Sequence, residues 1–349
     1  MDTNHTPQNS TKPEQTALDA KLGFLKRPDA YPEAPSRVES VETHMSWVFL
    51  TDTHAYKLKK PVRYAYLDFS TVEARRLDCE QEVRLNRRLA ADVYLGVMPL
   101  VRDAEGRLRL GGEGEAVDWL VRMRRLPAER MLDHLLRSGS VEQAEICQLA
   151  RRLARFYATA AADVITPEAY RQGLAERIED NLHELGSPEF GLDPDQTQRL
   201  ACLQLSFLQT HAGLFDRRVR QGRIVEGHGD LRPEHVCLLP QPVVIDCLEF
   251  KREFRILDPA DELGYLALEC ERLHAPEVGR WLLESYREAS GDAPPVALIH
   301  FYQSCRAVLR AKLAVWHLRD DGRHPPGKWL ATARDYLDLA QRHAEQAGS

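Results

Sequence analysis

Hydrophobic and polar positions over the first 125 residues follow strand-like and helix-like patterns in turn. Residues 46–51 and 54–60 are rich in strand-forming residues and lie on either side of a two-residue turn, which predicts a hairpin. Residues 71–90 carry apolar side chains at helical spacing among many helix formers, which predicts a helix. Residues 93–101 and 116–123 are apolar and flank a Gly- and Glu-rich turn, which predicts a second antiparallel pair.

Beyond Pro127 the pattern changes to amphipathic helices with a few short strands. Helices are expected at 141–159, 174–185, 196–211, 296–317 and 328–344, and strands at 224–226, 235–239 and 243–245. We therefore predict an α+β protein with a sheet-plus-helix lobe at 21–125 and a mainly helical lobe at 126–349. The polar segment 1–20 predicts a disordered tail.

Composition and charge exclude several classes of protein. The chain has 349 residues, 43% of them hydrophobic and 29% charged, which are ordinary globular values. Its net charge of −6 gives no electrostatic attraction to nucleic acid or to anionic membranes, so we expect neither as a partner. No apolar stretch approaches the roughly 18 residues of a membrane span, and we expect a cytoplasmic protein. Seven scattered cysteines without a C-x-x-C pair argue against a disulfide framework or a zinc ribbon.

The most informative stretch is EGHGDLRPEHVCLLPQPVVIDCLEF at 226–250. It places His228, Asp230 and Arg232 in one short loop, and Asp246 and Glu249 directly after an apolar strand. Carboxylates at this spacing suit magnesium, which prefers oxygen ligands and is commonly held together with substrate phosphates.

HGDLRPEH followed by IDCLEF resembles the catalytic and metal-binding loops of eukaryotic-like kinases, and most closely those of the aminoglycoside phosphotransferase and choline kinase-like family. The resemblance implies a two-lobed protein kinase-like fold, with ATP as phosphoryl donor and Mg²⁺ bound. It implies that Asp230 is the catalytic base, that His228 braces the loop and that Asp246 binds the metal. Arg232 would hold the transferring phosphoryl group, and Glu249 would supply a second carboxylate or be only a solvated residue.

His235 departs from the family pattern, because it stands where the metal-binding Asn is expected. Imidazole is a poorer magnesium ligand than an amide oxygen and suits manganese, zinc or iron better. Three interpretations stay open. Glu234 or Glu249 takes over the second metal site, the enzyme prefers another ion such as Mn²⁺, or the protein is a nucleotide-binding pseudokinase that regulates a protein partner.

The first lobe matches the same family at lower specificity. AYKLK offers Lys57 and Lys59 as the phosphate-binding lysine, and Glu82 fits its helix partner; alternatively, these lysines only protect a sheet edge. Residues 123–127, with Met123 and Arg125, resemble the hinge that reads adenine. Residues 257–263 resemble a segment whose second Asp, here Asp261, braces the catalytic loop.

The function implied by the resemblance is ATP-dependent phosphorylation of a hydroxyl on a small-molecule acceptor. The usual Gly-rich phosphate loop is absent from residues 41–49, as it is in many small-molecule kinases. The sequence leaves the acceptor and the oligomeric state open.

Overall fold

The computed structural model describes residues 12–64, 67–319 and 326–349. Its contacts divide the chain into two units. Unit 1 comprises Met1–Met131 and Val243–Arg252, and unit 2 comprises Leu132–Pro242 and Glu253–Ser349. The expected lobe boundary near residue 125 stays a prediction, and the structure adds that residues 243–252 pack with unit 1.

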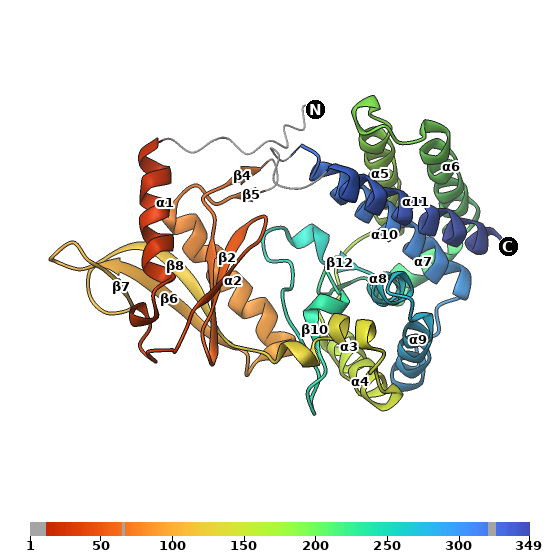
Figure 1. Cartoon of the computed structure of the whole chain (residues 1–349). Helices are drawn as coiled ribbons and strands as arrows, with labels where there is room; N and C mark the ends of the chain where they lie inside the picture. Colours follow the sequence, from red (N-terminus) through yellow and green to blue (C-terminus); the bar gives the residue numbers. More distant parts are fainter. Residues whose placement is uncertain (1–11, 65–66, 320–325) are drawn as a thin grey trace. The chain divides into compact units, whose positions relative to one another are not determined.

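Unit 1 is built on a six-stranded antiparallel sheet with the strand order β1-β2-β3-β8-β6-β7 (Figure 1). The strands are β1 (Glu39–Glu42), β2 (Ser46–Leu50), β3 (His54–Lys59), β6 (Tyr94–Arg102), β7 (Leu108–Leu110) and β8 (Glu115–Arg124). Both predicted antiparallel pairs are present, as β2 with β3 and as β6 with β8. Strand β7 formed within the segment that we expected to be only a turn. Short strands β4 (Arg63–Tyr64), β5 (Leu67–Asp68) and β11 (Val243–Val244) complete the unit.

Two helices, α1 (Lys12–Leu25) and α2 (Val72–Ala90), pack against this sheet. Neighbouring side chains on a strand point to opposite faces, so β3 contacts both helices. Tyr56 and Leu58 join the apolar cluster that contains Leu22 and Leu25 of α1. The alternate residues of β3 bond to α2, as described below. The carboxylate of Asp118 on β8 binds Lys21 of α1 and Arg75 of α2, so both helices are tied to the sheet through one buried group.

Helix α1 begins inside the segment 1–20, for which we expected a disordered tail. The physical reason is the apolar spacing of Leu18, Leu22 and Leu25, which places one side of the helix in the core of unit 1. Residues 1–11 of the expected tail lie outside the described residues.

Unit 2 is mainly helical. Its helices are α3 (Leu132–Ser138), α4 (Gln143–Thr159), α5 (Pro167–Leu185), α6 (Pro194–Thr210), α7 (Ala212–Arg220), α8 (Pro259–Arg272), α9 (Pro276–Ser290), α10 (Val296–Trp316) and α11 (Pro326–Gly348). The short strands β9 (Val225–Glu226) and β12 (Ile256–Leu257) pair with each other, and β10 (Val236–Cys237) follows the predicted catalytic loop. None of the helices in the described part of the chain is long and apolar enough to cross a membrane.

Helix α8 is the centre of unit 2. Every residue from Pro259 to Cys270 is buried, because α9, α10 and α11 contribute to the core around it. Asp258 caps its first turn by accepting from the backbone N–H of Ala260, and Pro259 occupies a position where no amide donor is needed. A helix buried on all sides holds its polar side chains in fixed positions, which becomes important for the loop that precedes it.

Leu25→Ala tests the packing of α1. Leu25 is fully buried, so we expect its truncation to lower the free energy of unfolding by about 2–5 kcal/mol. Leu77→Ala on the exposed side of α2 is the matched control and should change it by less than about 0.5 kcal/mol. Urea unfolding measures both values. Equal stability of the two variants would contradict the packing described here.

Candidate active site

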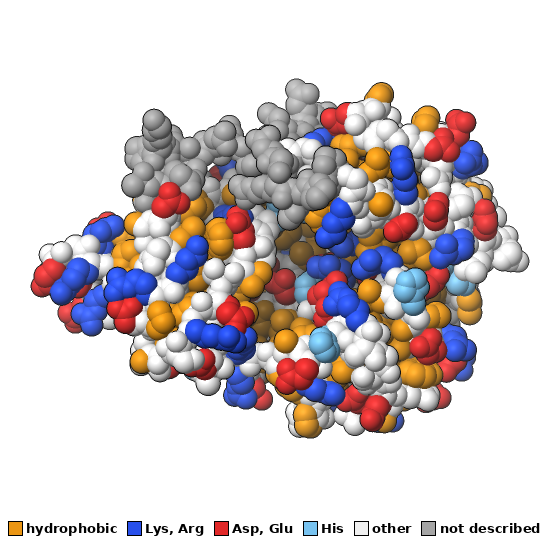
Figure 2. Space-filling view, in the orientation of Figure 1, with side chains coloured by type: hydrophobic (Ala, Val, Ile, Leu, Met, Phe, Trp, Pro, Cys, Tyr) orange, Lys and Arg blue, Asp and Glu red, His pale blue; other side chains and the backbone are white. Residues whose placement is uncertain are grey.

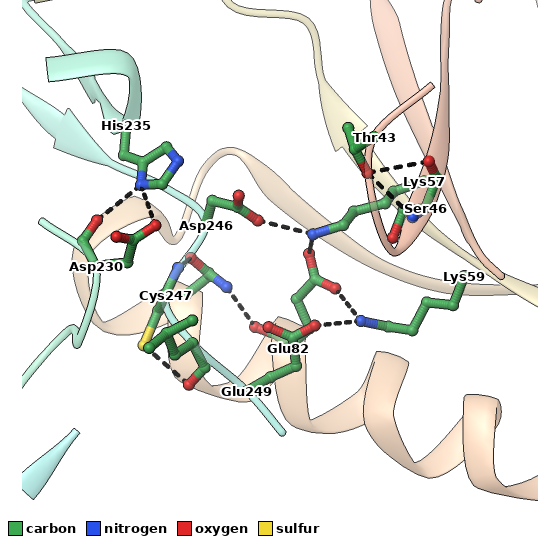
Figure 3. Close-up of polar contacts among 12 residues, drawn as sticks. Thr43, Ser46, Lys57, Lys59, Glu82, Asp230, His235, Asp246, Cys247 and Glu249 are labelled. Carbon is green, nitrogen blue, oxygen red and sulfur yellow. Dashed lines mark hydrogen bonds and ion pairs between the residues drawn. The ribbon is translucent and has the colours of Figure 1, made fainter. Parts of the chain in front are cut away.

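A buried ion network in unit 1 joins strand β3 to helix α2 (Figure 3). Lys57 and Lys59 lie on the same face of β3, and both donate to the one carboxylate of Glu82 on α2. The distances are 2.9 Å from Lys57 Nζ to Oε1 and 2.7 Å from Lys59 Nζ to Oε2. The predicted helix glutamate is therefore bonded to both candidate lysines at once.

Lys57 also contacts Asp246, which lies in the segment Val243–Arg252 of unit 1 (Figure 3). Its Nζ donates to Asp246 Oδ1 at 2.7 Å. Asp246 has φ of 61°, a left-handed conformation that is uncommon outside glycine and often marks a functional position. Its backbone N–H donates to the hydroxyl of Tyr94, and the next N–H, of Cys247, donates to Asn86 of α2. These two bonds hold the turn that presents the Asp246 carboxylate.

Lys59 is surrounded by three carboxylates. Its Nζ lies 2.6 Å from Asp78 Oδ2 and 2.7 Å from Glu82 Oε2, and it also donates to Glu249. Burial alone would lower the pKa of this lysine, but Glu249, Glu82 and Asp78 outweigh it and raise the pKa well above its ordinary value. Lys59 therefore stays charged and ties residues 246–249 to α2.

Exposure separates the two lysines. The side chain of Lys57 is 13% exposed and that of Lys59 is 0% exposed. Burial would lower the pKa of Lys57 as well, but Asp246, Glu82 and Glu249 raise it well above its ordinary value. Asp246 is half-exposed. The pair of Lys57 and Asp246 is thus the more exposed part of the network, whereas Lys59 and Glu249 are the more buried part.

The two predicted hinge residues lie at and after the end of β8. Met123 is buried and pairs with Ala55 on β3 and with Tyr94 on β6. Arg125 directs its guanidinium elsewhere, donating from one NH group to the carbonyl of Thr51 at 2.7 Å and lying 3.6 Å from Glu39. Its backbone N–H donates to Thr53. The structure therefore does not bring the Arg125 side chain to the lysine network.

In unit 2 the loop 228–235 carries the predicted catalytic group, Asp230. Arg232 Nε lies 3.0 Å from Asp230 Oδ1, and the hydroxyl of Tyr265 on α8 donates to the same oxygen at 3.3 Å. Burial would raise the pKa of Asp230, but nearby positive charge, above all that of Arg232, outweighs it and lowers the pKa to about 2. Asp230 is therefore ionised throughout the physiological pH range.

His235 is hydrogen-bonded through both ring nitrogens. Figure 3 shows the contacts of one of them with Asp230. Nδ1 lies 2.7 Å from the backbone oxygen of Asp230, and Nε2 lies 3.2 Å from a terminal nitrogen of Arg232. A carbonyl only accepts and a guanidinium only donates, so Nδ1 is assigned as the donor and Nε2 as the acceptor. A metal ion at Nε2 would have to displace Arg232.

The loop is braced from α8 by a residue that sequence reasoning missed. Glu262 accepts hydrogen bonds from the backbone N–H groups of His228, at 3.0 Å, and Gly229, and also from the hydroxyl of Tyr157 at 2.7 Å. The predicted brace, Asp261, acts one step away, because it binds Arg306, which donates to the carbonyl of Gly229. Both are acidic residues in the first turn of α8, and the sequence offers no signal that separates them.

A magnesium ion fits part of this residue set. No group of three or more His, Cys, Asp or Glu side chains able to hold a metal occurs among the residues described. Magnesium, however, is commonly bound by one or two carboxylates together with substrate phosphates, and the half-exposed oxygens of Asp246 suit that arrangement. Glu249 is engaged by Lys59, and His235 by Asp230 and Arg232, so Asp246 is the group best suited to the ion.

Lys59→Met tests the buried network. The change leaves carboxylates of Asp78, Glu82 and Glu249 with one cation fewer, and we expect it to lower the free energy of unfolding by about 3–5 kcal/mol at neutral pH. Burial already raises the pKa of Asp78 in the native protein, so loss of Lys59 raises it further. The deficit should then shrink as the pH falls and Asp78 takes up a proton. Lys57→Met, at the more exposed lysine, should lower the free energy of unfolding by less. Equal unfolding curves for the two variants, at neutral pH and at a lower pH alike, would contradict this interpretation.

Comparison with known proteins supports the architecture. No family model matches the chain. An uncharacterized protein of Mycobacterium tuberculosis is 35% identical over 323 residues, which is 91% of this chain, and the chain spans 62% of the length of that relative. A choline/ethanolamine kinase family protein from Mesorhizobium loti has a TM-score of 0.53 at 14% identity, covering 94% of this chain and 99% of the other. A thermostable mutant of aminoglycoside phosphotransferase APH(4)-Ia has a TM-score of 0.51 at 14% identity, covering 89% and 94%. The predicted α+β class is thereby confirmed, and the protein has the kinase-like fold of the choline/ethanolamine kinases and aminoglycoside phosphotransferases.

Proposed function

We propose that the protein is an ATP-dependent phosphotransferase that acts on a hydroxyl group of a small molecule. The observation that carries this proposal is the bonding of Lys57 to both Glu82 and Asp246. A strand lysine, a helix glutamate and a metal-binding aspartate form the set that kinases use to position nucleotide phosphates. The solved structures with the same fold include a choline/ethanolamine kinase family protein and an aminoglycoside phosphotransferase, which supports a small-molecule acceptor.

Unit 1 would hold the donor. Lys57 is the lysine that exchanges part of its contact with Asp246 for the phosphates of ATP, since it is the more exposed of the two. Asp246 would hold Mg²⁺, which when bound neutralises charge on the phosphates. Lys59 and Glu249 keep residues 246–249 on α2, so that the carboxylate of Asp246 is in place before the nucleotide arrives.

Unit 2 would act on the acceptor. Asp230 orients the acceptor hydroxyl and takes up its proton as the new bond to phosphorus forms and the bond to the leaving ADP oxygen breaks. A carboxylate with a pKa of about 2 is a weak base, so its main contribution in this state is orientation. Arg232 must release Asp230 for the hydroxyl to bind. The guanidinium of Arg232 can then donate hydrogen bonds to the negatively charged phosphoryl group that is transferred.

The paired variants Asp230→Asn and Asp246→Asn test this division of labour. Thermal unfolding with ATP and Mg²⁺ or Mn²⁺ reports nucleotide binding, because a ligand that binds the native state raises stability. We expect Asp230→Asn to keep the metal-dependent rise while losing turnover by at least about a hundredfold, on the usual scale for proton transfer by a positioned side chain. Asp246→Asn should lose the metal-dependent rise itself. Full activity in both variants would refute the proposal.

His235 carries the second candidate function, a nucleotide-binding pseudokinase, because it replaces the usual Asn. We propose instead that it positions Asp230 through its two hydrogen bonds. The shorter side chain of His235→Asn cannot bridge the Asp230 carbonyl and Arg232 together. We expect that variant to retain nucleotide binding and to lose roughly tenfold in kcat, equivalent to one hydrogen bond. A large gain in activity would instead favour the pseudokinase.

A further inference from the structure

Two arginines of unit 2 share one buried carboxylate close to the predicted catalytic loop. Glu269 on α8 has a side chain that is 1% exposed, and its Oε2 lies 2.9 Å from Nε of Arg272. Its Oε1 lies 3.5 Å from Nε of Arg310 on α10. The hydroxyl of Tyr336 on α11 donates to both oxygens, at 2.7 and 3.0 Å. Three helices thus build a cluster in which two positive charges face a single negative one.

The arginines are the outer part of this cluster. Their side chains are 29% exposed for Arg272 and 23% for Arg310, whereas Glu269 is hidden behind them. Figure 2 shows Lys and Arg side chains gathered over the part of unit 2 that contains α10 and α11. Nε of Arg310 donates to the hydroxyl of Tyr336 at 3.3 Å, which fixes the plane of the guanidinium. Within the described chain its two terminal nitrogens make no hydrogen bond, so a planar fork of donors is held in place with its outer edge open.

This fork lies close to Asp230. Tyr265, which donates to Asp230, precedes Glu269 by four residues on α8, so the two side chains are neighbours about 6 Å apart on one face of the helix. Burial would raise the pKa of Asp230, and the positive charge of Arg310 is among those that lower it. The carboxylate of Asp230 and the guanidinium of Arg310 therefore both contact side chains on this face of α8 and are close enough for their charges to interact.

The other charges nearby do not cancel this arrangement. Arg306 is fully used by Asp261, with bonds of 2.7 and 2.9 Å. Arg232 is paired with Asp230, and Glu234 lies 3.9 Å from Arg232. Glu234 also raises the pKa of Arg272, so its charge acts on that residue, whereas the carboxylate that acts on Arg310 is the buried Glu269.

We propose that Arg310, supported by Arg272, binds an anionic group of the acceptor molecule, a carboxylate or a phosphate, while the hydroxyl of the same molecule lies at Asp230. The position of the hydroxyl rests on the proposed function, whereas the anion site does not. The acceptor class is then small hydroxylated acids or phosphate esters. Cationic acceptors such as amino sugars or quaternary amines place a positive charge against an arginine fork, which disfavours them.

The test measures binding to the whole protein without nucleotide, by calorimetry at low ionic strength. The probes are glycerol 3-phosphate and D-glycerate, which carry the two kinds of anion, and choline as the cationic probe. We expect at least one anionic probe to bind at millimolar concentration and choline not to bind. Arg310→Gln should weaken that binding by roughly 10- to 100-fold, the value of charge-assisted hydrogen bonds.

Arg342→Gln is the matched control. It removes the same charge from an exposed arginine of α11 that pairs with Glu271, and it should leave binding unchanged. Equal weakening in both variants would reduce the effect to surface charge and overturn the proposal. So would tighter binding of choline, or failure of both anionic probes to bind.

Nucleotide binding, followed separately with ATP and Mg²⁺, distinguishes failure of this site from failure of the proposed function. If Arg310→Gln weakened ATP and left the anionic probes unaffected, the fork would belong to the donor and the proposal would be wrong. If the anionic probes bound but ATP did not, the anion site would be supported and the proposed kinase function would be refuted.

Discussion

The carboxylate of Glu82 is shared by two lysines of one strand, and the geometry of unit 1 depends on that sharing. Either lysine alone could be satisfied by one acid, but two ammonium groups two residues apart on one face repel each other. Glu82 lies between them, and Asp246 and Glu249 pair with them from the other side, so that attraction to carboxylates outweighs this repulsion. The strand, the helix and the segment 243–252 are thereby fixed against one another in a low-dielectric setting, where an unpaired member would be costly.

Unit 2 is also organised by buried carboxylates, and these belong to helix α8. Its carboxylates lie along one buried helix and each has a different partner. Glu262 holds the backbone of the loop, Asp261 holds Arg306, and Glu269 orients Arg310. The loop that carries Asp230 is therefore held by side chains of a rigid element, and its own sequence supplies His228, Arg232 and His235 as further contacts. Rigid support of this kind is what precise positioning of a reacting group requires.

The sequence predicted those parts of the fold in which one periodicity dominates. The hairpin of β2 and β3 and helix α2 follow directly from alternation and from helical spacing. Helix α1 was not predicted because its apolar residues follow a polar start. Strand β7 was not predicted because the glycines on one side of it are typical of a turn. The choice between Lys57 and Lys59 was beyond sequence, because residues two apart share a face and only burial by the surrounding chain separates them. Asp261 and Glu262 are adjacent acids on α8. Only the hydrogen bonds of the folded chain show that Glu262 is the one that holds the loop.

Unit 1 is assembled from two pieces of chain separated by 111 residues of unit 2, 132 to 242. During synthesis, the sheet and α2 emerge long before the residues that neutralise Lys57 and Lys59 from the other side. Until residue 249 has left the ribosome, two lysines on the nascent sheet share the acids of α2 alone. Unit 1 is therefore completed only after 111 residues of unit 2 have been made, and a fragment that ends at the chain's first crossing into unit 2 would carry the sheet without the segment that finishes its charge network.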